Sequence, residues 1–289
     1  MANPKVSALL PTYNTNPAYL RETIDSILAQ EFRNFELVII DDGSSSDEVK
    51  RVIDSYQDPR IVFAENEQNL GIALTRNKLI AMARGDYLAV VDHDDISTPD
   101  RFKKQAAFLD AHPEVGVVGS YNKKIPSNTL SEYPGDNDTI EEMLTHHKNS
   151  IFHPTTMIRK SVLTSNNLQY KPEHTPAEDY PLFCELIGKT KFANIQEPLL
   201  HYRWNKQNTS YAKQHLVSHI VAEASKRAAE EHPDIWLRGR GKIVKSYYYK
   251  LFGFIPFLTV REQGRKTTYL LFGFLPILKR RYRGSADWK

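Results

Sequence analysis

The sequence predicts an α/β protein with a mostly parallel β-sheet flanked by helices, and three observations support this prediction. Short apolar runs alternate with segments of helical spacing over the first 120 residues. Strands that alternate with helices are typical of βαβ units, which pair their strands in parallel. The loops after these strands, 11–16, 41–47 and 92–95, are also the most polar. Because ligands bind beyond the carboxyl ends of such strands, these loops are the candidate site.

The individual elements follow from the spacing of apolar residues, which differs between strands and helices. Strands are expected at residues 6–10, 35–40, 61–64, 87–91, 115–118 and 191–195. Helices are expected at residues 19–29, 47–52, 72–83, 102–109, 140–144, 177–187 and 211–231. Between residues 120 and 150 the pattern loosens, and we expect either a loop that faces the substrate or a surface excursion.

The composition is that of a globular protein, because 40% of the 289 residues are hydrophobic and 25% are charged. Cys184 is the single cysteine, which excludes an internal disulfide and a cysteine-based zinc site. No apolar run approaches the roughly 20 residues that span a bilayer. The first strand follows residue 5 without the architecture of a signal peptide. These observations predict a cytoplasmic location.

The formal net charge of +3 is divided unevenly along the chain. Residues 238–289 contain 13 Lys or Arg and two acids, whereas acids outnumber basic residues in the preceding part. We therefore expect two domains, residues 1–225 and residues 226–289, the second a basic, aromatic and helical C-terminal extension. This extension repeats itself, because residues 251–258 (Leu-Phe-Gly-Phe-Ile-Pro-Phe-Leu) recur as residues 271–278 (Leu-Phe-Gly-Phe-Leu-Pro-Ile-Leu).

Apolar and aromatic segments between clusters of cations suit the headgroup boundary of an anionic membrane. We therefore expect the extension to bind the inner face of the cytoplasmic membrane peripherally. The alternative is a helical hairpin that packs on the body of the protein or on a second copy of the chain in a homodimer. We expect no nucleic-acid partner.

Residues 92–95 (Asp-His-Asp-Asp) follow an expected strand directly. Carboxylates packed this closely raise one another's pKa unless a cation neutralises them. A divalent metal with oxygen ligands, Mn²⁺ or Mg²⁺, suits such a cluster. The alternative is an acidic loop that caps the helix after Asp100. Residues 41–44 (Asp-Asp-Gly-Ser) and 11–14 (Pro-Thr-Tyr-Asn) are weaker signals, since both also fit ordinary turns.

The spacing of many such pieces is more specific than any one of them. The pieces are Pro11 to Asn14, Gln30, Phe32, Phe35, Glu36, Ile39, Asp41 to Ser44, Asn69, Gly71, Arg76, Asn77, Gly85 to Tyr87, Asp92, Asp94, Asp95, Glu178, Asp179, Tyr202 and Arg203. With this pattern the chain resembles glycosyltransferase family 2, whose members have the GT-A fold and transfer a sugar from a nucleotide-sugar. The resemblance covers roughly residues 6–210 and leaves the C-terminal extension outside.

The resemblance implies a donor-binding role for the residues of the first two loops. Pro11, Thr12 and Tyr13 would hold the base and ribose of the nucleotide. The Asp42 carboxylate would accept a hydrogen bond from the uracil N3–H, which favours a UDP-sugar. Arg76 would contact the diphosphate or the donor sugar.

The resemblance assigns the acidic loop to the diphosphate. Asp92 and His93 would lie on the ribose or diphosphate side, and Asp94 would bind the divalent metal that bridges the diphosphate. The metal and nearby cations would stabilise the charge of the leaving nucleoside diphosphate.

The acceptor side is carried by later residues. Asp179 would be the catalytic base that deprotonates the acceptor hydroxyl, and a direct displacement with a single base inverts the anomeric centre. By pattern alone, Glu178 and Asp179 also fit acids that complement the dipole at a helix N-terminus. His153, Glu178 and Arg203 are expected to contact the acceptor or the diphosphate.

The implied function is the transfer of one hexose or N-acetylhexosamine from a UDP-sugar to a glycan or lipid-linked glycan, as in the assembly of bacterial surface polysaccharide or lipooligosaccharide. Processive members carry Gln-x-x-Arg-Trp, whereas Leu200 stands at the first position here, which favours one transfer per event. A dTDP- or GDP-sugar donor is the alternative within this class. A non-catalytic glycan- or nucleotide-binding module and a metal-dependent nucleotidyltransferase are the alternatives from other classes.

Overall fold

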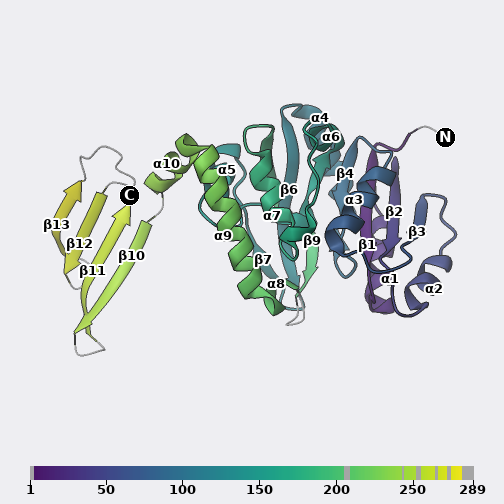
Figure 1. Cartoon of the computed structure of the whole chain (residues 1–289), viewed down its shortest axis with the longest axis horizontal. Coiled ribbons are helices and arrows are strands. Elements are labelled where there is room, and N and C mark those ends of the chain that lie inside the picture. Colours follow the sequence, from purple (N-terminus) through teal and green to yellow (C-terminus); the bar gives the residue numbers. More distant parts are fainter. Residues whose placement is uncertain are drawn as a thin grey trace. The chain divides into compact units, whose positions relative to one another are not determined.

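The computed structural model describes residues 3–204, 209–242, 244–251, 255–263, 266–271 and 275–281. The chain divides into two compact units, residues 1–228 and 229–289. Figure 1 shows the first unit as a sheet with helices on its faces and the second as a small sheet of its own. Within the described ranges, no helix combines the length and the apolar character needed to cross a bilayer.

The first unit is built on one nine-stranded sheet, with strand order β3-β2-β1-β4-β8-β6-β9-β5 and β7 paired to β6. The pairs β1–β2, β2–β3, β1–β4 and β6–β9 are parallel, and β4–β8, β6–β8, β6–β7 and β5–β9 are antiparallel. The strands are β1 (Val6–Thr12), β2 (Phe35–Asp41), β3 (Ile61–Glu65), β4 (Tyr87–Val90), β5 (Ile96–Ser97), β6 (Val115–Ile125), β7 (Thr129–Ser131), β8 (Met157–Arg159) and β9 (Lys191–Arg203).

Helices connect most of these strands, and the longer ones bury apolar residues. The helix α1, for example, starts at Pro17, where Asn16 caps its N-terminus, and buries Leu20, Ile24 and Ile27. The helices of the first unit are α1 (Pro17–Leu28), α2 (Glu48–Asp54), α3 (Ile72–Met82), α4 (Arg101–Ala111), α5 (Asn137–Leu144), α6 (Lys160–Ser165), α7 (Asp179–Leu186), α8 (Thr209–Ala212) and most of α9 (Gln214–Glu231), with short 3₁₀ turns at His153–Thr155 and Pro172–His174.

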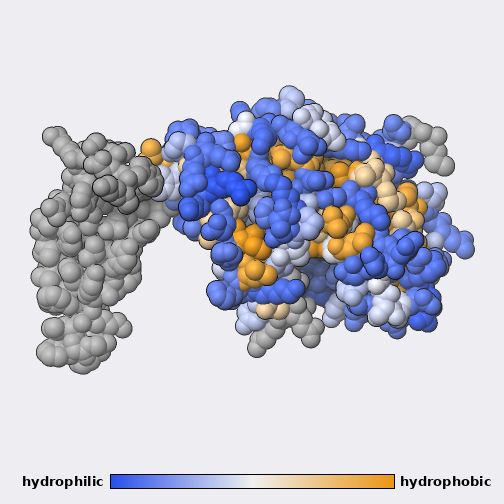
Figure 2. Space-filling view, viewed as in Figure 1, coloured by the Kyte–Doolittle hydropathy of each residue, from blue (hydrophilic) through white to orange (hydrophobic). Residues whose placement is uncertain are grey.

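The core lies between the sheet and these helices. Strands β1 and β2 are buried along their whole length, as expected for parallel strands covered on both faces. Phe102 of α4 is fully buried, and its ring meets Phe35 edge-to-face with centroids 5.6 Å apart. Figure 2 shows the surface of this unit as mostly hydrophilic on the visible face, with apolar residues in separate patches.

The register of the parallel strands brings their carboxyl ends together. Thr12 at the end of β1 pairs with Asp41 at the end of β2, which pairs with Glu65 at the end of β3. The amide of Val91, just after β4, donates to the Leu9 carbonyl of β1. The three polar loops that the sequence singled out therefore lie at one edge of the sheet.

Several parts of the body differ in detail from the sequence-based expectation, among them the short elements β5, β7 and α6, which were not expected. The strand at Lys191 continues to Arg203, well beyond the expected residue 195, and pairs along β6 with several register shifts. The three-residue strand β8 was not expected, because a run as short as Met157–Arg159 carries no detectable periodicity.

The expectation of a helical C-terminal extension is wrong beyond Lys242. Helix α10 (Pro233–Lys242) is followed by the antiparallel strands β10 (Val244–Leu251), β11 (Ile255–Gln263), β12 (Lys266–Leu271) and β13 (Leu275–Arg281), in that order. Tyr, Val, Thr and Ile are frequent here, and such residues favour strands. Pro256 and Pro276 stand where the strand register shifts, a position that tolerates proline. The aromatics Phe252, Phe254, Phe272, Phe274, Tyr282 and Trp288 lie outside the described residues.

Candidate active site

The loops after β1 and β2 are tied to each other by side-chain hydrogen bonds. The Asn14 amide donates to Ser44 Oγ at 2.8 Å, and Asn14 Oδ1 accepts from the Ser45 amide at 2.9 Å. Asn14 has a φ of 46°, which turns the chain and leaves the neighbouring Tyr13 ring 47% exposed. Pro11 and Thr12 are buried beneath it. Of the three residues expected to hold the nucleotide in this loop, Tyr13 presents the accessible surface.

Asp42 organises the neighbouring loop. Its carboxylate accepts hydrogen bonds from Asn66 Nδ2 at 2.7 Å and from the amides of Leu70 and Gly71 at 2.9 Å each. Gly71 caps the N-terminus of α3 with a φ of 86°, and a carboxylate there also complements the helix dipole. Asp42 is 4% exposed, so its carboxylate holds this loop together from within, and its contact with a nucleotide base stays a prediction.

The acidic loop 92–95 leaves the end of β4 and contains both accessible and buried carboxylates. Asp92, His93 and Asp94 are partly exposed, whereas Asp95 is buried. Burial raises the pKa of Asp94, and the nearby Asp92 carboxylate raises it further while His93 opposes the shift. Burial also raises the pKa of Asp95, with Asp92 and Asp94 adding to it. The loop therefore brings several carboxylates close enough to raise one another's pKa.

Arg76 joins the acidic loop to the segment that carries Asp179. Its guanidinium is buried, donates to Asp92 Oδ1 at 2.8 Å and places Nε 3.6 Å from Glu178 Oε1. Burial opposes the charge of Arg76, but Asp92, Tyr170 and Glu178 together raise its pKa above the usual value. The Arg76 charge in turn lowers the pKa of Asp92, although burial raises it. In this structure Arg76 bridges the two groups of acids.

His153 lies beneath the site rather than at its surface. It is 5% exposed, and its Nε2 is 2.7 Å from the hydroxyl of Tyr170. Burial and the nearby Arg76 hold the pKa of His153 well below its usual value. The backbone of Tyr170 is fixed by both atoms of the Asn77 side-chain amide, at 2.7 and 3.0 Å. His153 thus supports the segment that leads to Asp179, and its contact with an acceptor stays a prediction.

Asp179 is the first residue of α7 and is partly exposed. Burial raises its pKa to about 7, and the adjacent Glu178 carboxylate contributes to the rise. A carboxyl group with a pKa near the working pH is suited to take up a proton. Glu178 itself is buried and faces Arg76, so the sequence expectation of an acceptor contact is untested for Glu178.

Arg203, at the end of β9, holds the acidic loop from its other side. Its Nε donates to the Asp94 carbonyl at 2.9 Å, and its backbone amide donates to Asp95 Oδ1 at 2.8 Å. The guanidinium stacks over the Tyr19 ring, 4.0 Å from its centroid, and pairs with the Glu22 carboxylate. Arg203 was expected to contact the acceptor or the diphosphate, and the structure adds a role in positioning Asp94.

The donor set fits a divalent cation that is shared with a phosphate ligand. In the described part of the chain, no group of three or more His, Cys, Asp or Glu side chains is arranged to hold a metal ion. Mg²⁺ is commonly held by one or two carboxylates together with phosphate oxygens. Asp92 and Asp94 supply hard oxygen ligands of this kind, and a cation between them would relieve their mutual repulsion.

Arg101 supports the acidic loop from within the protein, a role that the sequence analysis did not predict. It is fully buried below the acidic loop, donating to the Val90 carbonyl at 2.8 Å and to Ser97 Oγ at 3.0 Å. Burial lowers its pKa to about 10, against the favourable charges of Asp95 and Asp92. An arginine in the apolar face of a helix was the available signal, since lone charges are rarely buried without a partner.

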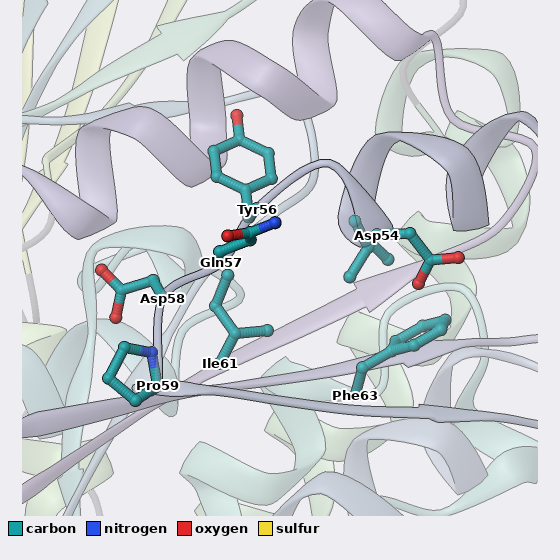
Figure 3. Close-up of a pocket in the computed structure, with 8 residues that line it drawn as sticks. Asp54, Tyr56, Gln57, Asp58, Pro59, Ile61 and Phe63 are labelled. Carbon is teal, nitrogen blue, oxygen red and sulfur yellow. The ribbon is translucent and has the colours of Figure 1, made fainter.

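A surface hollow of this unit lies away from these residues. It is formed by Ile61 and Phe63 of β3 together with Tyr56, Asp58 and Pro59 of the preceding loop (Figure 3). This loop enters β3 at its amino end, whereas the acidic residues follow the carboxyl ends of their strands. None of the residues expected in the site lines this hollow.

Comparison with known proteins assigns the class of the molecule. The profile of glycosyl transferase family 2 matches residues 7–165. An uncharacterized glycosyltransferase of Methanocaldococcus jannaschii is 32% identical over 231 residues, which cover 76% of this chain and 79% of that protein. WcaA of Escherichia coli K12, whose name describes a colanic acid biosynthesis glycosyl transferase, is 29% identical over 64% of this chain and 67% of its own length. The chain belongs to glycosyl transferase family 2.

Solved structures agree with this fold. TarS residues 1–349 of S. aureus, in complex with UDP-GlcNAc, superimposes with a TM-score of 0.61 at 20% identity over 82% of this chain and 80% of that chain. The mannosyltransferase PcManGT of Pyrobaculum calidifontis, in complex with GDP-Man and Mn²⁺, has a TM-score of 0.57 at 17% identity over 80% of this chain and 76% of that chain. The expected α/β fold with a mostly parallel sheet is confirmed as that of GT-A glycosyltransferases.

Proposed function

We propose that the protein is an inverting, metal-dependent glycosyltransferase that moves one hexose or N-acetylhexosamine from a UDP-sugar to a glycan acceptor. The observation that carries this proposal is the link through Arg76. It connects the Asp92 side of the acidic loop with Glu178, next to Asp179. A single guanidinium thus contacts an acid of the donor side and the neighbour of the proposed base.

On the donor side, Tyr13 offers an exposed ring for the nucleotide base, and the buried Asp42 carboxylate would accept a hydrogen bond from the N3–H of uracil. Asp92 and Asp94 would hold a divalent cation together with the diphosphate. When bound, such a cation neutralises the charge that develops on the leaving diphosphate. The solved relatives in complex with UDP-GlcNAc and with GDP-Man and Mn²⁺ support a nucleotide-sugar and a divalent metal.

On the acceptor side, Asp179 takes the proton of the attacking hydroxyl. The hydroxyl oxygen forms a bond to the anomeric carbon while the bond from that carbon to the diphosphate oxygen breaks, and the nucleoside diphosphate leaves with the electron pair. Because the attack comes from the face opposite the leaving group, the anomeric configuration inverts. A pKa of about 7 keeps a large fraction of Asp179 ionised near neutral pH.

The biological setting that we propose is the assembly of a surface polysaccharide or lipooligosaccharide on the cytoplasmic side of the membrane. The similarity to a protein named for colanic acid biosynthesis supports this setting. A dTDP- or GDP-sugar is the alternative donor, and the GDP-Man complex of a structural relative is the reason to test it.

The test is a panel of UDP-, dTDP- and GDP-sugars, each incubated with the full chain and Mn²⁺ or Mg²⁺, with release of the nucleoside diphosphate as the readout. We expect slow hydrolysis of one UDP-sugar that stops on chelation and in Asp94→Ala. Replacement of the exposed Lys213 by Gln is the control and should leave the rate unchanged. If the chain neither hydrolyses nor binds any nucleotide-sugar of the panel, the proposal is refuted. A non-catalytic glycan-binding module is then favoured.

A further inference from the structure

The C-terminal sheet places the two copies of the repeated eight-residue segment, residues 251–258 and 271–278, in equivalent positions. Strand β10 ends at Leu251 and β11 begins at Ile255, and these two residues pair. Twenty residues later, β12 ends at Leu271 and β13 begins at Leu275, and these also pair. The described residues of each copy therefore lie on the two paired strands of a β-hairpin. In a four-stranded meander the first and third connections lie at the same end, so the described residues of both copies lie at the same end of the sheet.

The register sorts the sheet into rows of four residues that lie side by side across the strands. Three successive rows, which we call the apolar rows, contain no charged residue. They are Tyr247-Val260-Tyr269-Leu278, Tyr248-Thr259-Leu270-Pro276 and Tyr249-Leu258-Leu271-Leu275. The first hairpin extends beyond them with Leu251 and Ile255 and with Lys250, the one charged residue of this end among the described residues.

The other three rows, which we call the basic rows, contain six Lys or Arg and one acid. They are Val244-Gln263-Lys266-Arg281, Lys245-Glu262-Thr267-Arg280 and Ser246-Arg261-Thr268-Lys279. The sheet is therefore divided along its strands, with an apolar half at the end where both copies lie and a cationic half at the other end.

This division differs from that of an ordinary packed sheet. Successive rows belong to opposite faces, so a sheet that packs on a protein body shows one apolar and one polar face. Here three consecutive rows are apolar, and the apolar half is apolar on both faces. A flat protein surface covers one face of a sheet, whereas a lipid layer surrounds both.

We propose that this unit inserts the apolar rows of its sheet into an anionic membrane surface, with the basic rows at the level of the lipid phosphates. Three rows at about 3.3 Å per residue span roughly 10 Å, which matches the depth of about 5–10 Å to which interfacial segments enter a bilayer. The inference does not depend on the proposed transferase reaction.

The test is co-sedimentation of the full chain with vesicles of phosphatidylcholine, with and without phosphatidylglycerol. We expect binding to the anionic vesicles that is lost as the ionic strength rises from about 0.1 M to about 1 M, where the Debye length shrinks from about 10 Å to about 3 Å. A triple variant with Lys279, Arg280 and Arg281 replaced by Gln should bind on the order of 100-fold more weakly, because each cation contributes about fivefold.

A matched control, which we call the α9 control, removes the same charge from exposed positions of α9 and the residue before it, by replacing Lys226 and Arg227 of α9 and Lys213 with Gln. It should bind as the unmodified chain does. A second variant, Leu251→Ser with Ile255→Ser, should weaken binding at every salt concentration while the salt dependence persists. Far-UV circular dichroism verifies that each variant keeps its secondary structure. The salt series is measured on the unmodified chain, so it tests the proposal even if a variant fails to fold.

Three results would overturn the proposal. One is the absence of sedimentation with anionic vesicles. Another is equal binding to vesicles of phosphatidylcholine alone, or an equal loss in the α9 control. The third is a stable dimer that binds no vesicle, which would assign the apolar rows to a second copy of the chain.

Discussion

Replacing Glu178 by Gln should shift the pH dependence of catalysis in a defined direction. Asp179 has a pKa of about 7 against an ordinary value of 3.8, and the difference corresponds to about 4 kcal/mol. Burial is the larger cause and the Glu178 carboxylate the next. Without the Glu178 charge, and with Arg76 no longer shared between two partners, the pKa of Asp179 falls.

We expect the fall to be roughly one pH unit, or about 1.4 kcal/mol. The acid limb of kcat/KM reports the ionisation of the base in the free enzyme. At pH 6, a base of pKa 7 is about 9% ionised and one of pKa 6 is half ionised, so the variant's rate at pH 6, relative to its own plateau, rises about fivefold. The assay is a pH profile of nucleoside diphosphate release from the active donor.

Glu173→Gln is the matched control, since Glu173 is an exposed acid of the same segment. Its profile should superimpose on that of the unmodified enzyme. An acid limb that stays in place in Glu178→Gln, or that moves to higher pH, would refute the electrostatic account of Asp179.

Further predictions concern stability and positioning. Asp179→Asn should abolish transfer yet raise the free energy of unfolding, by roughly 2 kcal/mol at pH 5 and up to about 4 kcal/mol at pH 8. Between pH 3.8 and about 7 Asp179 is protonated in the folded wild type and ionised in the unfolded chain, so the free energy of unfolding of the wild type falls as the pH rises through this window. Urea unfolding that shows the same stabilisation by Asp179→Asn at pH 5 and at pH 8 would contradict this. Arg76→Met should lower the free energy of unfolding by about 3–5 kcal/mol, because it leaves two acids without their buried cation, and a loss below 1 kcal/mol in the same assay would argue against the bridge. Arg203→Lys should weaken binding of UDP with Mn²⁺ roughly tenfold through the loop that it positions, whereas Glu22→Gln, at the exposed end of the same contact, should change it far less in calorimetry. Phe102→Ala should lower the free energy of unfolding by about 3–5 kcal/mol in chemical denaturation, because the ring is fully buried, and a denaturation midpoint equal to that of the wild type would contradict its place in the core.

The order of strands and helices in the body could be predicted because its periodicities are strong. Strand β2 is apolar apart from Glu36 and the closing Asp41, and α1 shows helical spacing between a proline start and a polar end. The same reasoning placed three polar loops at one edge of the sheet, and the register of β1 with β2 brings two of them together. In these segments the local preferences of the sequence agree with the tertiary structure, so the prediction holds.

The side-chain contacts between site residues could not be predicted from the sequence. The Arg76 bridge joins residues 16 and 102 positions apart, and the pairing of His153 with Tyr170 depends on how a loop folds over α3. Such contacts follow from packing, which no periodicity encodes. The C-terminal unit was misassigned for a different reason, since apolar residues next to proline and glycine fit an interrupted helix as well as a hairpin.

The central claim is that the two groups of acids have different roles. Asp92 and Asp94 bind the donor, and Asp179 acts in the chemical step. Calorimetric titration of UDP in the presence of Mn²⁺ into the wild type, Asp94→Asn and Asp179→Asn tests it most directly. The account predicts that Asp94→Asn loses most of the affinity, while Asp179→Asn binds as the wild type does and transfers no sugar. Equal loss of UDP binding in both variants, or full binding in Asp94→Asn, would contradict it.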